Sequence, residues 1–577
     1  PRSFADSPLS SWADGGANYR ENYPDLSFAD SDGDGIGDLP GIIDHLDHLV
    51  DLGVGAIWVS PFFASPQRDV GYDVSDYRDV APEYGTLDDA QRLIDEAHAR
   101  GLRVLFDLVL NHTSDQHPWF LESRSSRTND KADWYVWADG RTGPGGTRRP
   151  PNNWRSELQV TKAWQWAPER EQWYLASFLS FQPDLNWRHP EVRTEMFDMV
   201  RMWLGRGVDG FRLDIFGSIM QDPLLRDNGR TPMLVGGIPR LQTPTRTLNT
   251  DDNFRLAGDL RAVCDEFSAP GPDGAEHPGQ GERILLGEVF GSSEVLRRYV
   301  RDGDRDGLHV VFLFDFLAAR YGAGRYRDLI ESFEAEFPHP MQPTYVLENH
   351  DRTRSLSRVG GDVAKARVLA TLLATLRGVP VIYQGQEIGM TNRYIPLRQA
   401  NDPVPGVVAK RLPESLNRRL TERLNRDEVR TPMQWTSAPN AGFCPPDATP
   451  WLPVNDDHVT TNVEAASADP GSLLSLYREL LRHRAERPAL HGGDLRLVPS
   501  DDSVIAYQRT ARDDSGDRAL VVANLGDRAV VHLVAGGFTD VLVSTSAASA
   551  WSPDARGGGA LRLAPNSAAV LVPPAAS

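Results

Sequence analysis

Short hydrophobic segments recur along the chain from about residue 40 to residue 390, and amphipathic stretches separate them. A short apolar run bounded by polar and turn residues is typical of a strand in a parallel sheet. We therefore expect seven strands, within GAIWVSP (55–61), LRVLFDLVLNH (102–112), VDGFRLDIF (208–216), RILLGEVF (283–290), HVVFLF (309–314), TYVLENHD (344–351) and VPVIYQGQE (379–387). An eighth strand is expected near the start of the chain.

The stretches between these segments have the pattern of helices. In DDAQRLIDEAHARG, residues 88–101, the apolar positions recur at spacings of three and four, and Gly101 stands where a helix typically ends. Alternating strands and helices predict a parallel sheet. Eight such units predict a closed barrel, so the fold class is α/β with a (β/α)8 TIM barrel.

Two stretches interrupt this alternation of strands and helices, and a third stretch follows it. Residues 113–186 have clustered Trp, Pro and Gly with poor periodicity, which predicts a small domain B inserted after the third strand, and residues 391–450 predict a long functional excursion. From residue 488 to 577, short alternating runs with Gly and Asp turns predict a C-terminal antiparallel β-sandwich domain. The barrel is then formed by residues 1–112 and 187–487.

Composition excludes several classes of protein. The 577 residues include 61 Lys and Arg against 80 Asp and Glu, and this net charge of -19 argues against nucleic acid or an anionic membrane as a partner. No apolar run is long enough to span a membrane. The chain opens at PRSFADS without a signal core, which favours a cytoplasmic, bacterial-like protein over a secreted one. Monomer and homodimer both remain open.

Charged residues stand where several of the predicted strands end. Arg212 and Asp214 are two positions apart on a strand, so their side chains share one face. The polar residues at strand ends are Asp107, Asn111, His112, Arg212, Asp214, Glu288, His350 and Asp351. Carboxylates that converge on one barrel mouth are typical of glycosidic bond chemistry, with Tyr72 and Phe181 among the aromatic rings available to stack on a sugar.

Ordered motifs carry a resemblance to a known family. DLVLNH (107–112), QPDLN (182–186), GFRLDIF (210–216), GEVF (287–290) and ENHD (348–351) resemble the signature regions of the α-amylase family, glycoside hydrolase family 13. Further stretches are similar to its oligo-1,6-glucosidase and α-glucosidase subgroup: GIGDLPGI (35–42), GYDVSDY (71–77), NHTSDQHPWF (111–120) and RTPMQW (430–435). The resemblance covers essentially the whole chain.

The resemblance implies roles for individual residues. Asp214 would be the nucleophile, Glu288 the general acid and base, and Asp351 the carboxylate that stabilises the transition state. Arg212 would lower the pKa of Asp214 and hold it ionised. The implied substrate-binding residues are His112 and His350, which would bond ring hydroxyls, and Asp69, Tyr72 and Arg426, which would close the nonreducing end of the pocket with an Asp69–Arg426 ion pair.

The stretch DSDGDGIGD, residues 30–38, has acidic residues at alternate positions with glycines between them. Oxygen-ligand loops for a hard cation require this arrangement, and the stretch also resembles the calcium site of the subgroup. The expected ligands of a structural Ca²⁺ are Asp30, Asp32, Asp34, Ile36 and Asp38. A solvated acidic turn is the alternative, and no organic cofactor is expected.

The function implied is a retaining, exo-acting α-glucosidase or transglucosidase that cleaves short oligosaccharides or disaccharides through a covalent β-glucosyl-enzyme. An isomerase of the trehalose synthase or sucrose isomerase type is the first alternative, and a noncatalytic sugar-binding homologue is the second. Ile215 after the nucleophile favours α-1,6 preference in this subgroup. The departures from the family pattern at 154–166 and 352–354 leave the linkage open.

Overall fold

The computed structural model describes residues 27–158, 161–230, 233–235, 238–240, 242–268, 281–405, 425–535, 537–554 and 558–574. All seven predicted strands are present: β1 (Ala56–Val59), β4 (Arg103–Leu108), β10 (Gly210–Leu213), β13 (Ile284–Gly287), β16 (Val310–Val311), β17 (Thr344–Val346) and β18 (Val379–Val381). The first five form a parallel sheet in that order, and β17 pairs in parallel with β18. A parallel bridge from Phe312 to Thr344 joins the two groups. The expected eighth strand lies outside the described residues.

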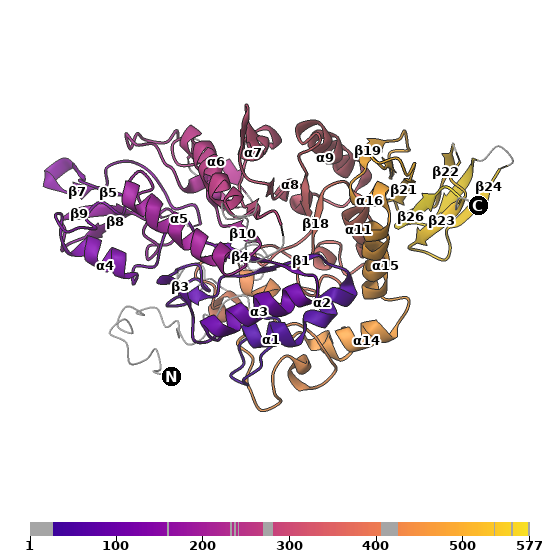
Figure 1. The fold of residues 1–577 in the computed structure, drawn as a ribbon, viewed down its shortest axis with the longest axis horizontal. Coiled ribbons are helices and arrows are strands. Elements are labelled where there is room, and N and C mark those ends of the chain that lie inside the picture. The colour runs from indigo at the N-terminus through magenta and orange to yellow at the C-terminus, as the bar shows by residue number, and fades with distance from the viewer. Residues whose placement is uncertain are drawn as a thin grey trace, which may run out of the picture.

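Helices lie around these strands, which occupy the centre of the view in Figure 1. The helix predicted from residue 88 is α3 (Leu87–Ala99), and it begins with a capping box between Thr86 and Asp89. Further helices are α1 (Leu39–Asp44), α2 (Leu46–Leu52), α5 (Pro190–Gly205), α6 (Asp251–Asp265), α7 (Ser293–Val300), α8 (Phe314–Ala318), α9 (Ala323–Glu336), α10 (Ser355–Arg358), α11 (Val363–Thr375), α14 (Val463–Ala468), α15 (Leu473–Glu486) and α16 (Pro488–His491). Within the described ranges, none of the helices is long and apolar enough to cross a membrane.

The barrel strands have two faces, and each face packs against a different part of the molecule. On β10, Phe211 and Leu213 join the large core that includes the helices. The opposite face carries Arg212, which is in register with Leu286 of β13 and Asp107 of β4. A separate apolar cluster fills the barrel interior, formed by Leu105, Leu286, Val310, Phe312, Leu317 and Val346. Asp107 and Glu288 each stand two positions beyond a member of this layer, Leu105 and Leu286, toward the carboxyl ends of their strands.

Residues 113–186 contain a helix and small sheets of their own. The helix is α4 (Pro118–Ser125), and the strands are β5 (Trp137–Ala138), β6 (Arg141–Thr142), β7 (Arg148–Arg149), β8 (Trp164–Ala167) and β9 (Gln172–Leu175). Antiparallel pairing joins β5, β9 and β8 in that order. Trp154, Ala163, Trp164 and Leu175 form a small apolar cluster beside them. Figure 1 shows these strands at one end of the molecule.

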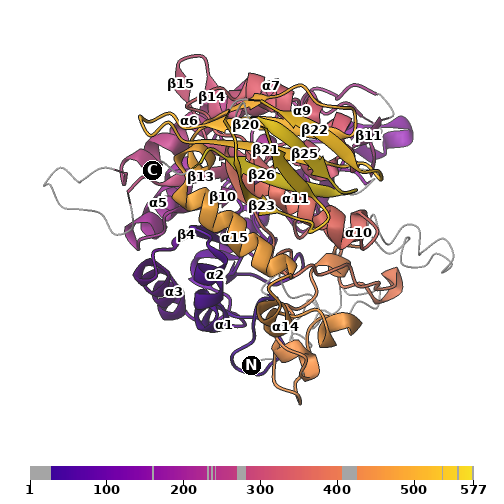
Figure 2. The same ribbon diagram turned by 90° about the vertical axis from the view of Figure 1, so that its right-hand side faces the viewer.

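The C-terminal sheets lie at the other end, and Figure 2 faces them directly. One antiparallel sheet contains β19 (Asp494–Leu497), β20 (Val504–Thr510), β21 (Arg518–Asn524), β26 (Ser567–Val572) and β23 (Asp540–Ser544). The other contains β22 (Val530–Val534), β25 (Gly559–Leu563) and β24 (Ala550–Pro553). Buried residues of both sheets share one apolar cluster, which includes Val522 and Leu561. The antiparallel C-terminal strands are thus as predicted.

Candidate active site

Arg212 lies at the centre of a buried carboxylate cluster at the mouth of the barrel. Its Nη1 donates to Asp214 Oδ1 at 2.8 Å and to both oxygens of Asp107 at 2.9 Å. Its Nη2 donates to Glu288 Oε2. The four residues come from strand ends β4, β10 and β13, which are neighbours in the sheet. One guanidinium therefore serves three carboxylates.

Aromatic side chains fix Asp107 within this cluster. Trp58 Nε1 donates to Asp107 Oδ2 at 3.1 Å, and Tyr72 Oη lies 3.3 Å from the same oxygen. The Tyr72 hydroxyl also lies 3.0 Å from His350 Nε2. The Arg212 guanidinium lies 4.8 Å from the Trp58 ring centroid, within cation–π range. Tyr72 thus connects the Arg212 cluster to the His350–Asp351 segment.

The charge balance of this cluster overturns one expectation. Burial, together with the Glu288 and Asp107 carboxylates, raises the pKa of Asp214 well above its usual range, although Arg212 opposes the shift. Burial likewise raises the pKa of Asp107 to about 6 despite Arg212. The prediction that Arg212 gives Asp214 a low pKa is wrong, because one cation is shared by three buried carboxylates.

Ile215 follows Asp214 in an unusual conformation. Its φ of 37° and ψ of 42° lie in the left-handed region, where β-branched residues are rare. Its backbone N–H lies 3.4 Å from Glu288 Oε2. Backbone strain of this kind persists only where the surroundings enforce it, and it is frequent at active sites. The turn after β10 therefore links the backbone behind Asp214 to the Glu288 carboxylate.

Asp351 is held by two arginines from a distant segment. Arg430 Nη2 donates to Asp351 Oδ1 at 3.0 Å, and Arg426 Nη1 approaches the same oxygen at 3.3 Å. Arg430 also donates through Nε to the backbone oxygen of His350 at 2.9 Å. His350 Nε2 lies 3.4 Å from Asp351 Oδ2. We call this group, with Asp69 and Asp402 described next, the arginine clamp.

The expected ion pair between Asp69 and Arg426 is present, with Nη2 and Oδ1 3.0 Å apart. Asp402 is a second buried partner of Arg426, at 2.8 Å from Nη2. The second oxygen of Asp69 accepts from Gln182 Nε2 at 2.8 Å. Arg426 therefore joins Asp69, Asp351 and Asp402, which come from three different loops.

Within the clamp, the pKa of Asp351 shifts in the direction opposite to that of Asp214, whereas burial raises the pKa of Asp69 despite Arg426. Burial raises the pKa of Asp351, but His350, Arg426 and Arg430 outweigh it, so the net pKa lies far below the usual range. Burial lowers the pKa of His350 to about 3, so its imidazole is neutral near pH 7. Asp351 is consequently a permanent anion in this arrangement.

The two remaining predicted sugar-binding residues have different surroundings. His112 Nε2 lies 3.2 Å from the backbone oxygen of Tyr72, and burial lowers the pKa of His112 to about 3. The guanidinium of Arg68 lies 3.9 Å over the ring of Phe181. That face of Phe181 is therefore not available to stack on a sugar.

Comparison with known proteins places this site in a family. A family model described as the catalytic domain of alpha amylase matches residues 22–493. The chain belongs to the α-amylase family. A probable alpha-glucosidase of Rhizobium meliloti (strain 1021) is 41% identical over 530 residues, which is 89% of either chain. This α-amylase family member is therefore a glycoside hydrolase.

Solved structures agree with this placement. The α-glucosyl transfer enzyme XgtA is 37% identical, with a TM-score of 0.83 that covers 96% of this chain and 99% of that one. The trehalulose synthase MutB of Pseudomonas mesoacidophila MX-45 is 32% identical, with a TM-score of 0.81 over 96% and 100% of the chains. The family therefore accounts for the barrel and the C-terminal sheet domain together.

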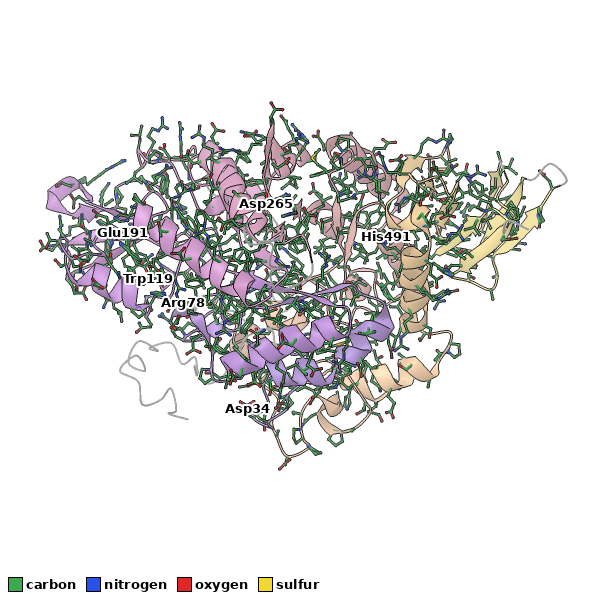
Figure 3. The ribbon with its side chains drawn as sticks, in the orientation of Figure 1. Asp34, Arg78, Trp119, Glu191, Asp265 and His491 are labelled. Carbon is green, nitrogen blue, oxygen red and sulfur yellow. The ribbon has the colours of Figure 1, made fainter. Side chains whose placement is uncertain are left out.

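For an α-amylase family member, the acidic loop before α1 needs separate description. Carboxylate oxygens of Asp30, Asp32 and Asp38 lie within 4.8 Å of one another. Asp34 instead accepts from the backbone N–H of the buried Ile36 at 2.8 Å, and Figure 3 labels it near α1, away from the barrel centre. Three of the five expected ligands are therefore gathered, in a donor set that suits a hard cation.

Sequence reasoning missed Asp402, Gln182 and Arg430 as parts of the site. Gln182 and Arg430 do stand inside quoted motifs, QPDLN and RTPMQW, so a signal for them existed. Asp402 lies in an irregular stretch without a periodic pattern. Only its contact with Arg426, 24 positions away, reveals it.

Proposed function

We propose that this glycoside hydrolase is a retaining α-glucosidase or transglucosidase that removes one α-glucosyl unit at a time from short oligosaccharides or disaccharides. The observation that carries the proposal is the sharing of Arg212 by Asp214 and Glu288 through its two terminal nitrogens. Such sharing favours the carboxyl separation of about 5 Å that retaining enzymes use, over the wider gap that an inverting enzyme needs for water.

In this mechanism Asp214 attacks the anomeric carbon while Glu288 gives a proton to the departing oxygen, which yields a β-glucosyl-enzyme. Glu288 then takes a proton from water, or from a hydroxyl of a second sugar, and the resulting attack on the same carbon restores the α-configuration. Asp214 attacks as a carboxylate, so we expect substrate binding to favour its ionised form, with Arg212 as the counter-charge. Asp351 stabilises the positive charge that develops on the ring.

Exo-action is supported by the arginine clamp. The Asp69–Arg426 pair is buried and is braced by Asp402 and Gln182. A sugar chain extended beyond the first ring would have to break this network, at the cost of leaving buried charges unpaired. We therefore assign ring-hydroxyl recognition to Asp69, Tyr72, His112 and His350.

The test is a product profile with maltose, isomaltose, sucrose, trehalose and nigerose, followed by nuclear magnetic resonance from the first turnover. The α-anomer of glucose as first product supports the proposal, and the best substrate identifies the linkage. The β-anomer as first product would overturn retention. Asp214→Asn is the matched control and is expected to release no glucose.

A second candidate is a glucosyl-transfer isomerase, because trehalulose synthase and an α-glucosyl transfer enzyme are among the similar structures. The chemistry up to the glucosyl-enzyme is the same. The difference is the acceptor: the released sugar attacks through another hydroxyl before water enters. New disaccharides from sucrose or maltose, with little free glucose, would select this candidate in the same experiment.

We further propose a structural Ca²⁺ held by Asp30, Asp32 and Asp38. Asp38 also caps α1 by accepting from Gly41 N, so the ion would couple the loop to that helix. We expect Ca²⁺ to raise the melting temperature and a chelator to lower it. Asp32 is exposed, so Asp32→Asn is expected to abolish this difference with little other effect, whereas Asp44→Asn, outside the loop, should retain it. Identical melting with and without Ca²⁺ would reject the site.

We propose the division into domains because separate apolar clusters lie in separate parts of the chain. The separate apolar cluster around Trp154 and Trp164 supports an inserted domain B over residues 113–186. The cluster shared by the two C-terminal sheets supports a β-sandwich over residues 488–577.

A further inference from the structure

A buried ion pair outside the sugar-binding residues closes the loop that carries Asp351. Glu348 precedes Asp351 and Arg354 follows it, and their Oε1 and Nη1 atoms lie 3.3 Å apart. Both side chains are almost completely buried. The other oxygen of Glu348 accepts from the backbone N–H of Ser355. Glu348 thus holds the far end of a loop whose middle residue is the clamped carboxylate.

The same arginine reaches the segment that supplies the clamp. Arg354 Nη2 donates to the backbone oxygen of Val429 at 3.0 Å, and Nη1 donates to that of Gln384 at 2.8 Å. Val429 ends the short 3₁₀ helix that begins at Arg426, and Arg430 comes next in the chain. Arg354 therefore binds the backbone between the two arginines that hold Asp351.

Neighbouring groups make this connection rigid. The Tyr383 ring lies 4.8 Å from the Arg354 guanidinium, and its hydroxyl also donates to Val429 O at 3.3 Å. The Arg354 backbone N–H donates to Asn392 Oδ1 at 2.9 Å. Within the Asp351 loop, the Asp351 N–H donates to Asn349 Oδ1. Three loops at the barrel mouth are thus joined at one buried guanidinium.

We propose that the Glu348–Arg354 pair is a positioning device, which sets Asp351 and the two clamp arginines at the spacing that binds the terminal glucosyl ring. Arg354 acts only through these residues and is not itself a catalytic residue. The inference rests on the proposed function in naming glucose as the ring. Beyond that function, we infer that Arg354 holds the loop after β17 and the segment 426–430 in a fixed position relative to each other.

The test measures binding of an iminosugar that mimics the glucosyl ring, by titration calorimetry, in parallel with kcat and KM for an aryl α-glucoside. In Arg354→Met we expect iminosugar affinity to fall at least about 10-fold and kcat/KM about 100-fold, because displacements near 1 Å have effects of this size. Glu348→Gln should shift both in the same direction by less. Arg354→Lys keeps the charge without the two-carbonyl fork and should be intermediate.

Arg377 provides the matched control, because it lies near the amino ends of β17 and β18, whereas Arg354 lies beyond their carboxyl ends. Arg377 is also buried, pairs with Glu334 at 2.7 Å and donates to the backbone oxygens of Met341 and Phe337. Arg377→Met should lower the melting temperature but leave iminosugar affinity unchanged. Unchanged affinity in folded Arg354→Met, or in folded Glu348→Gln if the former does not fold, would overturn the inference. A wild-type enzyme that neither binds the iminosugar nor cleaves α-glucosides would instead overturn the proposed function.

Discussion

The two halves of the site use the same residue types with opposite results. Around Arg212, three buried carboxylates share one guanidinium, and the pKa of Asp214 rises. Around Asp351, two arginines face the carboxylates, and its pKa falls. Burial penalises both carboxylates, so the difference lies in the neighbouring charges: one cation and two further carboxylates at Asp214, and His350 with two arginines at Asp351. Burial therefore favours the protonated carboxyl at Asp214, whereas Asp351 stays a carboxylate.

This division suits a double displacement. Acid and base catalysis needs a proton that moves between the enzyme and the leaving oxygen, whereas an oxocarbenium-like transition state needs an anion that stays ionised throughout. Asp351, beside Arg426 and Arg430, provides this anion, so the position of the two arginines matters to the reaction as well as to stability.

The largest effect is expected for Asp214→Asn, which replaces the attacking carboxylate beside Arg212 by a neutral amide. We expect kcat/KM for an aryl α-glucoside to fall by about four orders of magnitude or more, because no covalent intermediate forms. Asp76→Asn, a change at an exposed aspartate, is the control and should retain activity. A loss of less than tenfold in Asp214→Asn would contradict the assignment of the nucleophile.

Removing a cation from each half tests the comparison itself. Arg212→Met deletes the guanidinium that the three carboxylates share, so the pKa of Asp214 should rise further. The nucleophile acts when ionised, and the acid limb of kcat/KM should therefore move to higher pH, with about a 100-fold loss near pH 7.

Arg430→Met leaves Arg426 beside Asp351, so that carboxylate stays ionised and the acid limb should move less. The measurement is a pH profile of kcat/KM for both variants. A larger shift in Arg430→Met than in Arg212→Met would contradict the explanation by cation number.

A smaller effect is expected on stability. Because the folded pKa of Asp107 is raised to about 6, its ionisation destabilises the fold, and this penalty is absent below about pH 4 and complete above about pH 6. In Asp107→Asn the penalty disappears, so its unfolding free energy should change less than that of the wild type between pH 4 and 6, by about 1–3 kcal/mol. Urea unfolding at several pH values measures this. Parallel curves for the two proteins would refute it.

Ionisation of Asp351 changes the unfolding free energy in the opposite direction to ionisation of Asp107. Its folded pKa lies below the unfolded value, so the stability that it contributes is present above about pH 4 and is lost as the pH falls further. Urea unfolding of Asp351→Asn and Asp107→Asn at the same pH values compares the two carboxylates. The wild-type protein should lose stability relative to Asp351→Asn below about pH 4 and relative to Asp107→Asn between about pH 4 and 6.

The sequence predicted the parts of this site that follow a strand. Arg212 and Asp214 share a face because side chains alternate along β10, and Asp107 and Glu288 follow from the same rule on the neighbouring strands. The seven strands were predictable for the same reason, since each is a short apolar run. Local periodicity determines these features, and one sequence displays it directly.

The pKa of Asp214 and the origin of the clamp were not predictable in this way. The first depends on how many carboxylates reach one guanidinium, which requires the register between strands. The second depends on Arg426 and Asp402, which meet across irregular loops where no spacing rule applies. Contacts between loops follow from the fold as a whole, and the loop after β17 is the clearest instance, because Glu348 and Arg354 acquire a role only through Val429.

The smallest effect is expected at an exposed pair that has the same chemistry without burial. Arg78, labelled in Figure 3, and Glu195 lie 3.2 Å apart, and 43% of each side chain is exposed. Solvent and salt screen such a pair, so Arg78→Met should change the unfolding free energy by less than about 1 kcal/mol and leave kcat/KM unchanged. Urea unfolding at low and high salt measures the difference, which should shrink as salt is added. A loss of unfolding free energy above about 2 kcal/mol in Arg78→Met would show that an ion pair can be strong without burial. The opposite pKa shifts of Asp214 and Asp351 would then need an explanation other than the desolvation of their charges.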